Sequence, residues 1–251
     1  MQNARPVFGV FAPGGEPVSM LIRDPPGDAD RTMVARIPRT PGQSEFTGRF
    51  MSSPIRRAVR GFVVRFSIRN RTRKAALIAD WMTAHGCQTV LFVGSSGAEN
   101  ITANENIVEL ELARRFDVVM AVNLTPRTTP YPFQVADGRD MPFPDRWVDF
   151  ALANAIIEHV GDEEDQRRFV NEQTRVARCW VITTPNRWFP IESHTEAVLR
   201  HWSPSWRSRQ KRFTRLLSRK EFAALLPTGT EVIGRPWSAT FIALWDADRS
   251  H

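Results

Sequence analysis

The sequence predicts an α/β fold, built on a doubly wound, mostly parallel sheet with an antiparallel strand near the C-terminus and preceded by an N-terminal extension. Two observations favour this fold. From residue 89 onward, short apolar segments alternate with polar segments that are compatible with helices, and the apolar segments end in glycine or a polar residue. Near the C-terminus, two apolar runs at 231–233 and 239–245 indicate a closing pair of strands.

The chain has 251 residues, of which 42% are apolar, which is enough for one α/β domain with an extension. We expect three parts. Residues 1–50 are rich in proline and glycine turn signals and predict an irregular arm. Residues 51–85 carry apolar positions at helix-like spacing and predict a basic, amphipathic helical lead-in. Residues 86–251 then form the domain, with an insertion at about 185–215.

The positive charge is concentrated in two runs. Eight of the residues from Arg56 to Lys74 are basic and none is acidic, and a second basic run spans Arg200 to Lys220. Such runs can contact an anionic surface, although most charge runs are solvated faces of helices. We therefore keep Arg56–Lys74 as a candidate anionic contact, and favour the alternative that this helix face packs on the domain.

The composition excludes several classes of protein. No apolar stretch approaches the roughly 18 residues of a membrane span, and the N-terminus has no signal-peptide core, so we expect a cytoplasmic protein. Cys87 and Cys179 form no C-x-x-C pair, which favours two reduced thiols and gives no support for a metal site.

Glycine and polar residues follow the predicted strands at the points where these strands end. The strands are predicted at 89–93, 118–122, 134–136, 147–153 and 179–183, with helices at 104–115 and 162–177. Ligands of doubly wound sheets bind beyond the carboxyl ends of the strands. The candidate site residues at these ends are Gly94, Ser95, Gly97, Asn123, Asp137 and Asn154.

The order of motifs resembles the class I S-adenosylmethionine (SAM)-dependent methyltransferases, in particular the methyltransferase type 11-like family. Residues 136–150 read ADGRDMPFPDRWVDF and are similar to the family segment D-A-x-x-L-P-F-P-D-x-S-F-D. Residues 157–160, IEHV, stand at the family position L-E-H-V, and residues 184–194, TPNRWFPIESH, are similar to an insertion found in this group. The resemblance implies a Rossmann-like fold with SAM as the cofactor.

The cofactor motifs depart from the family pattern. Where the family has V-L-D-V-G-C-G-T-G, residues 90–98 read VLFVGSSGA, so Gly94 matches while Phe92 replaces the acid. Asn123 replaces the acid that binds the ribose hydroxyls in the family, and a neutral amide is a weaker acceptor than a carboxylate. The resemblance further implies that Asp137 and Gly138 bind the adenine.

Two histidines are candidates for a proton-transfer role. Methyl transfer from SAM needs mainly correct positioning of donor and nucleophile, and a general base helps only where the nucleophile carries a proton. His159 lies in the IEHV motif and His194 in the predicted insertion. A role for His159 in orienting its loop by hydrogen bonds is an equal alternative to catalysis.

The function expected first is methyl transfer to a small-molecule or lipid-like acceptor. A non-catalytic member of the family that acts through a partner is the alternative, based on the altered turn and on Asn123. An RNA methyltransferase is a third reading, supported only by the basic runs. Residues 154–157 read NAII where base-amino methyltransferases carry an Asn-Pro-Pro-Tyr-type tetrapeptide, which argues against base amino groups as the acceptor but not against ribose or other RNA targets. Nucleic acid is therefore the less expected partner. The oligomeric state is left open by the sequence.

Overall fold

The computed structural model describes residues 54–97, 106–190 and 214–249, and the chain divides into two compact units, Met1–Met51 and Ser52–His251. The predicted N-terminal arm lies outside the described residues. So does most of the predicted insertion, at 191–213. The structure below is that of the second unit.

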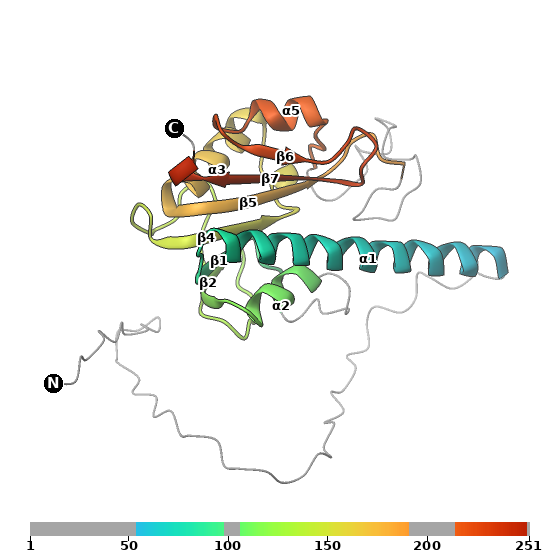
Figure 1. Ribbon diagram of the computed structural model, residues 1–251, viewed down its shortest axis with the longest axis horizontal. Coiled ribbons are helices and arrows are strands. Elements are labelled where there is room, and N and C mark those ends of the chain that lie inside the picture. The colour runs from blue at the N-terminus through green and yellow to red at the C-terminus, as the bar shows by residue number, and fades with distance from the viewer. Residues whose placement is uncertain (1–53, 98–105, 191–213, 250–251) are drawn as a thin grey trace, which may run out of the picture. The chain divides into compact units, whose positions relative to one another are not determined.

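A seven-stranded sheet forms the centre of this unit, in the order β3-β2-β1-β4-β5-β7-β6 (Figure 1). Strands β1 to β5 pair in parallel, whereas β7 runs antiparallel to both β5 and β6. The predicted fold class is therefore confirmed. The strands are β1 (Thr89–Val93), β2 (Asp117–Asn123), β3 (Phe133–Val135), β4 (Val148–Asn154), β5 (Ala177–Pro185), β6 (Glu231–Ile233) and β7 (Thr240–Asp246).

Strand β1 is buried on both faces, as expected of a central parallel strand with helices on both sides. Leu91 and Val93 pack in one hydrophobic core, whereas Val90 and Phe92 pack in the other. Phe92 is completely buried, and its ring meets that of Tyr131 edge to face at 5.5 Å. Phe92, the residue at the family's acid position, thus points into the same core as Val90 and not toward the strand ends.

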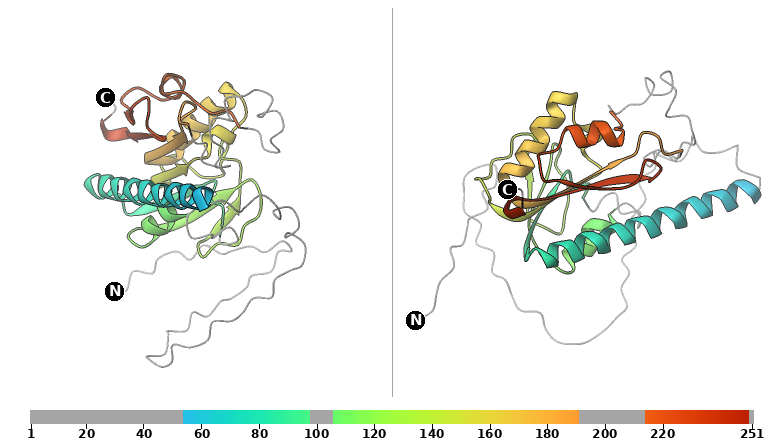
Figure 2. Two further views of the ribbon diagram at one scale, coloured as in Figure 1. Left: turned by 90° about the vertical axis from the view of Figure 1, so that its right-hand side faces the viewer. Right: turned by 45° about the horizontal axis from the view of Figure 1, so that its top comes forward.

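Helices α1 (Pro54–Ala84) and α2 (Ile107–Ala113) cover one face of the sheet (Figures 1 and 2). The predicted helical lead-in is a single helix that begins at a proline, where the missing N–H costs no helical hydrogen bond. Its second half buries Ala75, Ile78 and Met82. The chain leaves α1 at Gly86, whose φ of +63° suits the left-handed position after a helix.

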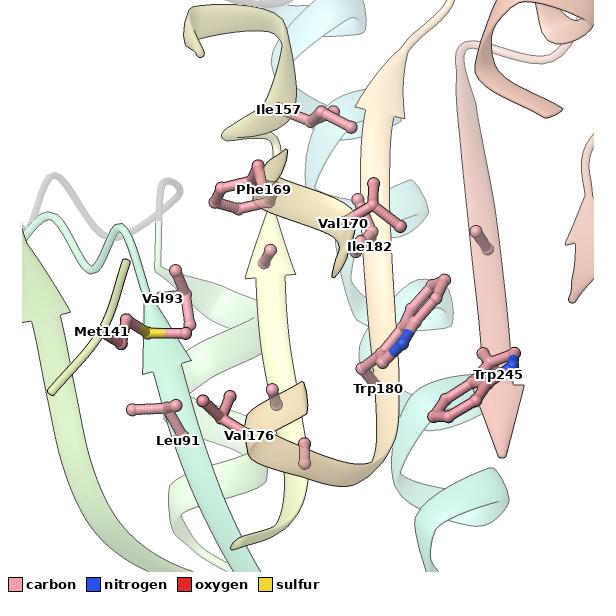
Figure 3. Packing of buried hydrophobic residues seen from close by; sticks show 14 of the residues in the cluster. Leu91, Val93, Met141, Ile157, Phe169, Val170, Val176, Trp180, Ile182 and Trp245 are labelled. Carbon is pink, nitrogen blue, oxygen red and sulfur yellow. The ribbon is translucent and has the colours of Figure 1, made fainter. Parts of the chain in front are cut away.

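The other face carries the short α5 (Arg219–Ala224) and α3 (Glu163–Val176) (Figure 2). Phe169 and Val176 of α3 pack against Trp180 and Ile182 of β5, and Trp180 stacks on Trp245 of β7 (Figure 3). The sequence analysis did not predict α5.

Two polar residues of α3 hold the segment that follows β3. Glu172 accepts a 2.6 Å hydrogen bond from the Met141 N–H, and Arg175 donates to the carbonyls of Met141 and Phe143. The backbone of the apolar 141–143 segment is therefore held by two charged side chains of α3. Within the described ranges, no helix is both long and apolar enough to cross a membrane.

Asp149, in β4, binds the beginning of β1 through hydrogen bonds. Its carboxylate accepts 2.9 Å hydrogen bonds from the Gln88 N–H, the Thr89 N–H and the Thr89 hydroxyl. Asp149→Ala should lower the free energy of unfolding by about 1–3 kcal/mol, because these donors lose a charged acceptor. Urea denaturation measures the change. Asp117→Ala, an exposed carboxylate at the start of β2, is the matched control and should change stability by less than about 0.5 kcal/mol. Equal effects of the two substitutions would contradict this role of Asp149.

Candidate active site

The turn after β1 is built on two glycines in the left-handed region, Gly94 with φ +78° and Gly97 with φ +72°. The N–H groups of Gly94 and Ser95 both donate to the Val122 carbonyl, at 2.8 and 3.1 Å. A Cβ on Gly94 would lie 2.4 Å from Cδ1 of Ile156, so only glycine fits both the backbone and the space. The turn is therefore tied to the end of β2 and packed against the segment after β4.

Ser95 connects the turn to both of its neighbours. Its side chain is buried, and its hydroxyl donates a 2.8 Å hydrogen bond to Oε2 of Glu109 in α2. Its carbonyl accepts a 2.8 Å hydrogen bond from Nδ2 of Asn123. Next to it, Ser96 donates to Oδ1 of Asn106, whose Nδ2 in turn donates to the Gly97 carbonyl. Asn106 and Glu109, at the start of α2, therefore hold the turn in place through hydrogen bonds.

Glu109 is an ionisable group that the sequence analysis missed. Burial raises the pKa of its carboxyl to about 7, and the hydrogen bond from Ser95 only partly opposes this rise. Among the described residues, no cation pairs with the Glu109 carboxylate. A carboxyl group in this state is protonated in about half of the molecules near neutral pH.

Asn123 and Asp137 follow β2 and β3, as predicted, but both side chains already have partners. The Asn123 amide donates to Ser95, and its Oδ1 accepts from the Thr125 N–H at 3.3 Å. Asp137 is held by Arg139 at 2.6 Å, and Arg139 also binds Asp165 at 2.7 Å. Hydrogen bonds from Arg139 hold the pKa of Asp137 below its usual value.

Gly138 lies behind Asp137 and is closely packed. A Cβ at this position would lie 2.6 Å from the ring of Phe169, and the Gly138 carbonyl accepts a 2.9 Å hydrogen bond from Gln173. The conformation of this segment is thus determined by α3.

Asn154, at the end of β4, contacts a lysine from a distant part of the chain. Its Oδ1 accepts hydrogen bonds from Nζ of Lys74 at 2.7 Å and from the Thr183 hydroxyl at 2.9 Å. The pKa of Lys74 is lowered to about 8 by burial and by the positive charge of Arg71, against the attraction of Glu158. The sequence analysis placed Lys74 among the cations of a surface run, whereas the structure directs it inward to the strand ends. Arg65, Arg69 and Arg73 of the same run are exposed.

The segment after β4 carries the IEHV motif. Ala155 has a φ of +59°, an unfavourable conformation for a residue with a side chain. Glu158 is fully buried and accepts from the Thr184 hydroxyl at 3.3 Å, and Nδ1 of His159 lies 3.3 Å from the Thr214 hydroxyl. His194, the second predicted candidate, lies outside the described residues.

The sheet order places most predicted site residues in one row. Along the carboxyl edge, β3, β2, β1 and β4 are consecutive neighbours in the sheet. Asn123 and Asn154 are the last residues of β2 and β4, and Asp137 and Gly94 come after β3 and β1. Hydrogen bonds join Ser95 to Asn123 directly. In the part of the chain that the structure describes, no three His, Cys, Asp or Glu side chains gather as a metal site would require.

Glu109→Gln should stabilise the free protein at alkaline pH. The folded-state pKa of Glu109 is about 7, above the ordinary value of 4.5, so folding favours the protonated carboxyl. The wild-type protein is therefore penalised as the pH rises from about 4.5 through 7, whereas glutamine stays neutral. At pH 8 we expect the variant to be more stable by about 1–3 kcal/mol, with no difference near pH 4.

Urea denaturation at the two pH values measures this difference. Glu111→Gln is the matched control, because Glu111 lies on the same helix and pairs with Arg115 at the surface. A variant that is less stable than wild type at pH 8 would show that the carboxylate itself supports the fold.

Comparison with known proteins gives a family for the central part of the chain. Residues 93–179 match the model of the family described as methyltransferase domain. This segment runs from the end of β1 into β5, and it includes Gly94, Asn123, Asp137 and Asn154. No curated protein matches the chain significantly.

Several solved structures are similar in outline and low in sequence identity. The 1,6-didemethyltoxoflavin-N1-methyltransferase of Burkholderia thailandensis, solved with 1,6-didemethyltoxoflavin and S-adenosylhomocysteine, is 14% identical; the match covers 78% of this chain and 90% of that chain, with a TM-score of 0.43. A SAM-dependent methyltransferase of Clostridium acetobutylicum is 8% identical over 68% of this chain and 89% of its own, with a TM-score of 0.47. One from Methanosarcina mazei is 14% identical over 63% and 91%, with a TM-score of 0.42.

The family match covers the strands that carry the glycine turn and the polar strand ends. It supports S-adenosylmethionine as the cofactor. The match of residues 93–179 to the methyltransferase-domain model confirms the resemblance to the class I SAM-dependent methyltransferases.

Proposed function

We propose that this protein transfers a methyl group from SAM to a small-molecule or lipid-like acceptor at the carboxyl edge of its sheet. The observation that carries the proposal is the contact between Lys74 and Asn154. It brings a partly buried amine to the strand end that adjoins the glycine turn, since β4 is the neighbour of β1. An amine of lowered pKa in such a position is typical of a group that handles protons or anionic ligands.

The turn fits a cofactor such as SAM in two respects. Gly94 and Gly97 give it the left-handed backbone with which such turns approach a ligand closely. Beside it, the partly buried Glu109 carboxylate has no cationic partner among the described residues, and SAM is a cationic ligand. Gly94, Ser95, Gly97 and Asn123 would hold the cofactor from this side, with Asp137 and Gly138 farther along the edge. When bound, SAM would supply an electrophilic methyl group, which a nucleophile attacks in line while S-adenosylhomocysteine leaves as a neutral thioether.

Lys74 would act on the acceptor side. With a pKa of about 8, a substantial fraction of its amine is neutral at pH 7.5 and can accept a proton from an acceptor hydroxyl or amine. Its hydrogen bond to Asn154, itself held by Thr183, fixes the amine in place. His159 remains a second candidate for this role, adjacent to the buried Glu158.

Exposed aromatic rings favour an acceptor with an apolar part. Phe66 of α1 is 43% exposed and stacks on Phe189, which follows β5, with ring centroids 6.3 Å apart. Trp188 beside it is 60% exposed. Large apolar groups at a surface are typical of binding sites when several lie together.

A non-catalytic protein of the same fold is the second candidate function. It is favoured by the two side chains at the family's ribose and adenine positions, because Asn123 is bonded to Ser95 and Asp137 to Arg139. A protein of this kind would not bind SAM.

Calorimetric titration with S-adenosylhomocysteine separates the two functions. The enzyme should bind with a dissociation constant in the micromolar range or tighter, about −8 kcal/mol or more favourable. Absence of binding at millimolar ligand would reject methyl transfer and leave the non-catalytic function.

Lys74→Met should reduce methyl transfer about tenfold or more and leave the affinity for S-adenosylhomocysteine within threefold, because it removes a proton acceptor on the acceptor side. Incorporation of labelled methyl groups from SAM into the small-molecule and lipid fractions of a cell extract measures it. Arg73→Met, its exposed neighbour on α1, is the control. Label in the nucleic-acid fraction alone would contradict the proposed acceptor class.

A further inference from the structure

Glu109 lies beside the turn that follows β1 and outside the family motifs quoted above. It comes from α2, and its Oε2 accepts a 2.8 Å hydrogen bond from the hydroxyl of Ser95, a residue of the turn itself. The same Ser95 contacts Asn123 through its carbonyl. The carboxylate is therefore located where β1, β2 and α2 meet.

The two places where the family has acids are not available for a ligand's charge in this chain. Phe92 is completely buried between the sheet and the helices on that face. Asn123 is neutral, and its amide group donates a hydrogen bond to the Ser95 carbonyl of the turn. Farther along the edge, Asp137 is neutralised by Arg139.

The charge of Glu109 is uncompensated in the described structure. Its carboxylate contacts Ser95 of the turn, and its helix α2 packs against α1. The titratable side chain that interacts with its charge is the phenol of Tyr131, which precedes β3 and is not a cation. An ionised carboxylate that is buried without a partner is unfavourable, and a cationic ligand removes this penalty. SAM carries an ammonium, a carboxylate and a sulfonium at its methionine end and no charge on its adenosine, so its net charge is positive and the ammonium is the group that can donate to a carboxylate.

We propose that Glu109 is the cofactor-site carboxylate of this protein and pairs with the positively charged methionine end of SAM. The inference rests on the proposed function, since it concerns the same cofactor. Glu109 thereby replaces, from the following helix, the charge that Phe92 and Asn123 do not provide. Ser95 positions the carboxylate through its hydrogen bond.

The test compares two ligands that differ in this charge. Calorimetric titrations at pH 7.5 use S-adenosylhomocysteine, which carries the ammonium, and 5′-methylthioadenosine, which lacks the amino-acid part. Glu109→Gln should weaken S-adenosylhomocysteine about tenfold or more, as for loss of a charge-assisted hydrogen bond, and change 5′-methylthioadenosine by less than about twofold. Glu111→Gln, on the surface of the same helix, should leave both affinities unchanged.

The pH dependence provides an independent readout. Between pH 5.5 and 7.5 the wild-type affinity for S-adenosylhomocysteine should rise about tenfold, because Glu109 must lose its proton to pair with the ammonium, whereas the Gln variant should show a flat profile. The ammonium itself stays protonated over most of this range.

The outcomes separate the inference from the function beneath it. If wild-type protein binds S-adenosylhomocysteine and Glu109→Gln binds it equally well, the assignment of Glu109 is wrong and the methyltransferase function stands. Equal weakening of both ligands overturns the charge pairing in the same way. If wild-type protein binds neither ligand, the proposed function fails and the inference fails with it.

Discussion

The hydrogen bonds between the turn after β1 and the end of β2 are the constraint on which the rest of the site depends. The Val122 carbonyl accepts hydrogen bonds from the N–H groups of Gly94 and Ser95. The turn can make both bonds only when β1 and β2 pair in the observed register. That register follows from the burial of β1 on both faces. Leu91 and Val93 belong to one core and Val90 and Phe92 to the other, so a shift by one residue would exchange the two sets.

Two partly buried ionisable groups of opposite sign flank this turn, and each belongs to a helix on the same face of the sheet. Glu109 of α2 reaches Ser95 on the β2 side, and Lys74 of α1 reaches Asn154 on the β4 side. Burial moves the pKa of the carboxyl up to about 7 and that of the amine down to about 8, so both groups titrate near neutral pH. A site with this arrangement can respond to a cationic ligand at one side and to a proton from an acceptor at the other.

Much of the fold could be predicted because its strands are apolar runs ended by polar residues. The short α5 was missed, although Ser218 and Glu221 form a capping box that the pattern S-x-x-E would have revealed. Lys74 lies four and eight residues before the buried Ile78 and Met82, a spacing that places it on the same face of α1. The sequence analysis overlooked this spacing because Lys74 belongs to a run of arginines. The partners of Asn123 and Asp137 could not be predicted, since they depend on how Ser95 and Arg139 are turned in space.

The departures from the family motifs are linked to one another. With phenylalanine at position 92, the layer between the sheet and α1 is completed by an aromatic ring, which packs on Tyr131. An acid in that layer would need a partner inside the core, whereas phenylalanine packs directly with the hydrophobic residues of that layer. With asparagine at position 123, the end of β2 gains an N–H donor for the Ser95 carbonyl, which a carboxylate could not provide. Both substitutions therefore strengthen the scaffold of the turn and remove negative charge from it, and the carboxylate of Glu109 restores a single negative charge at the same place.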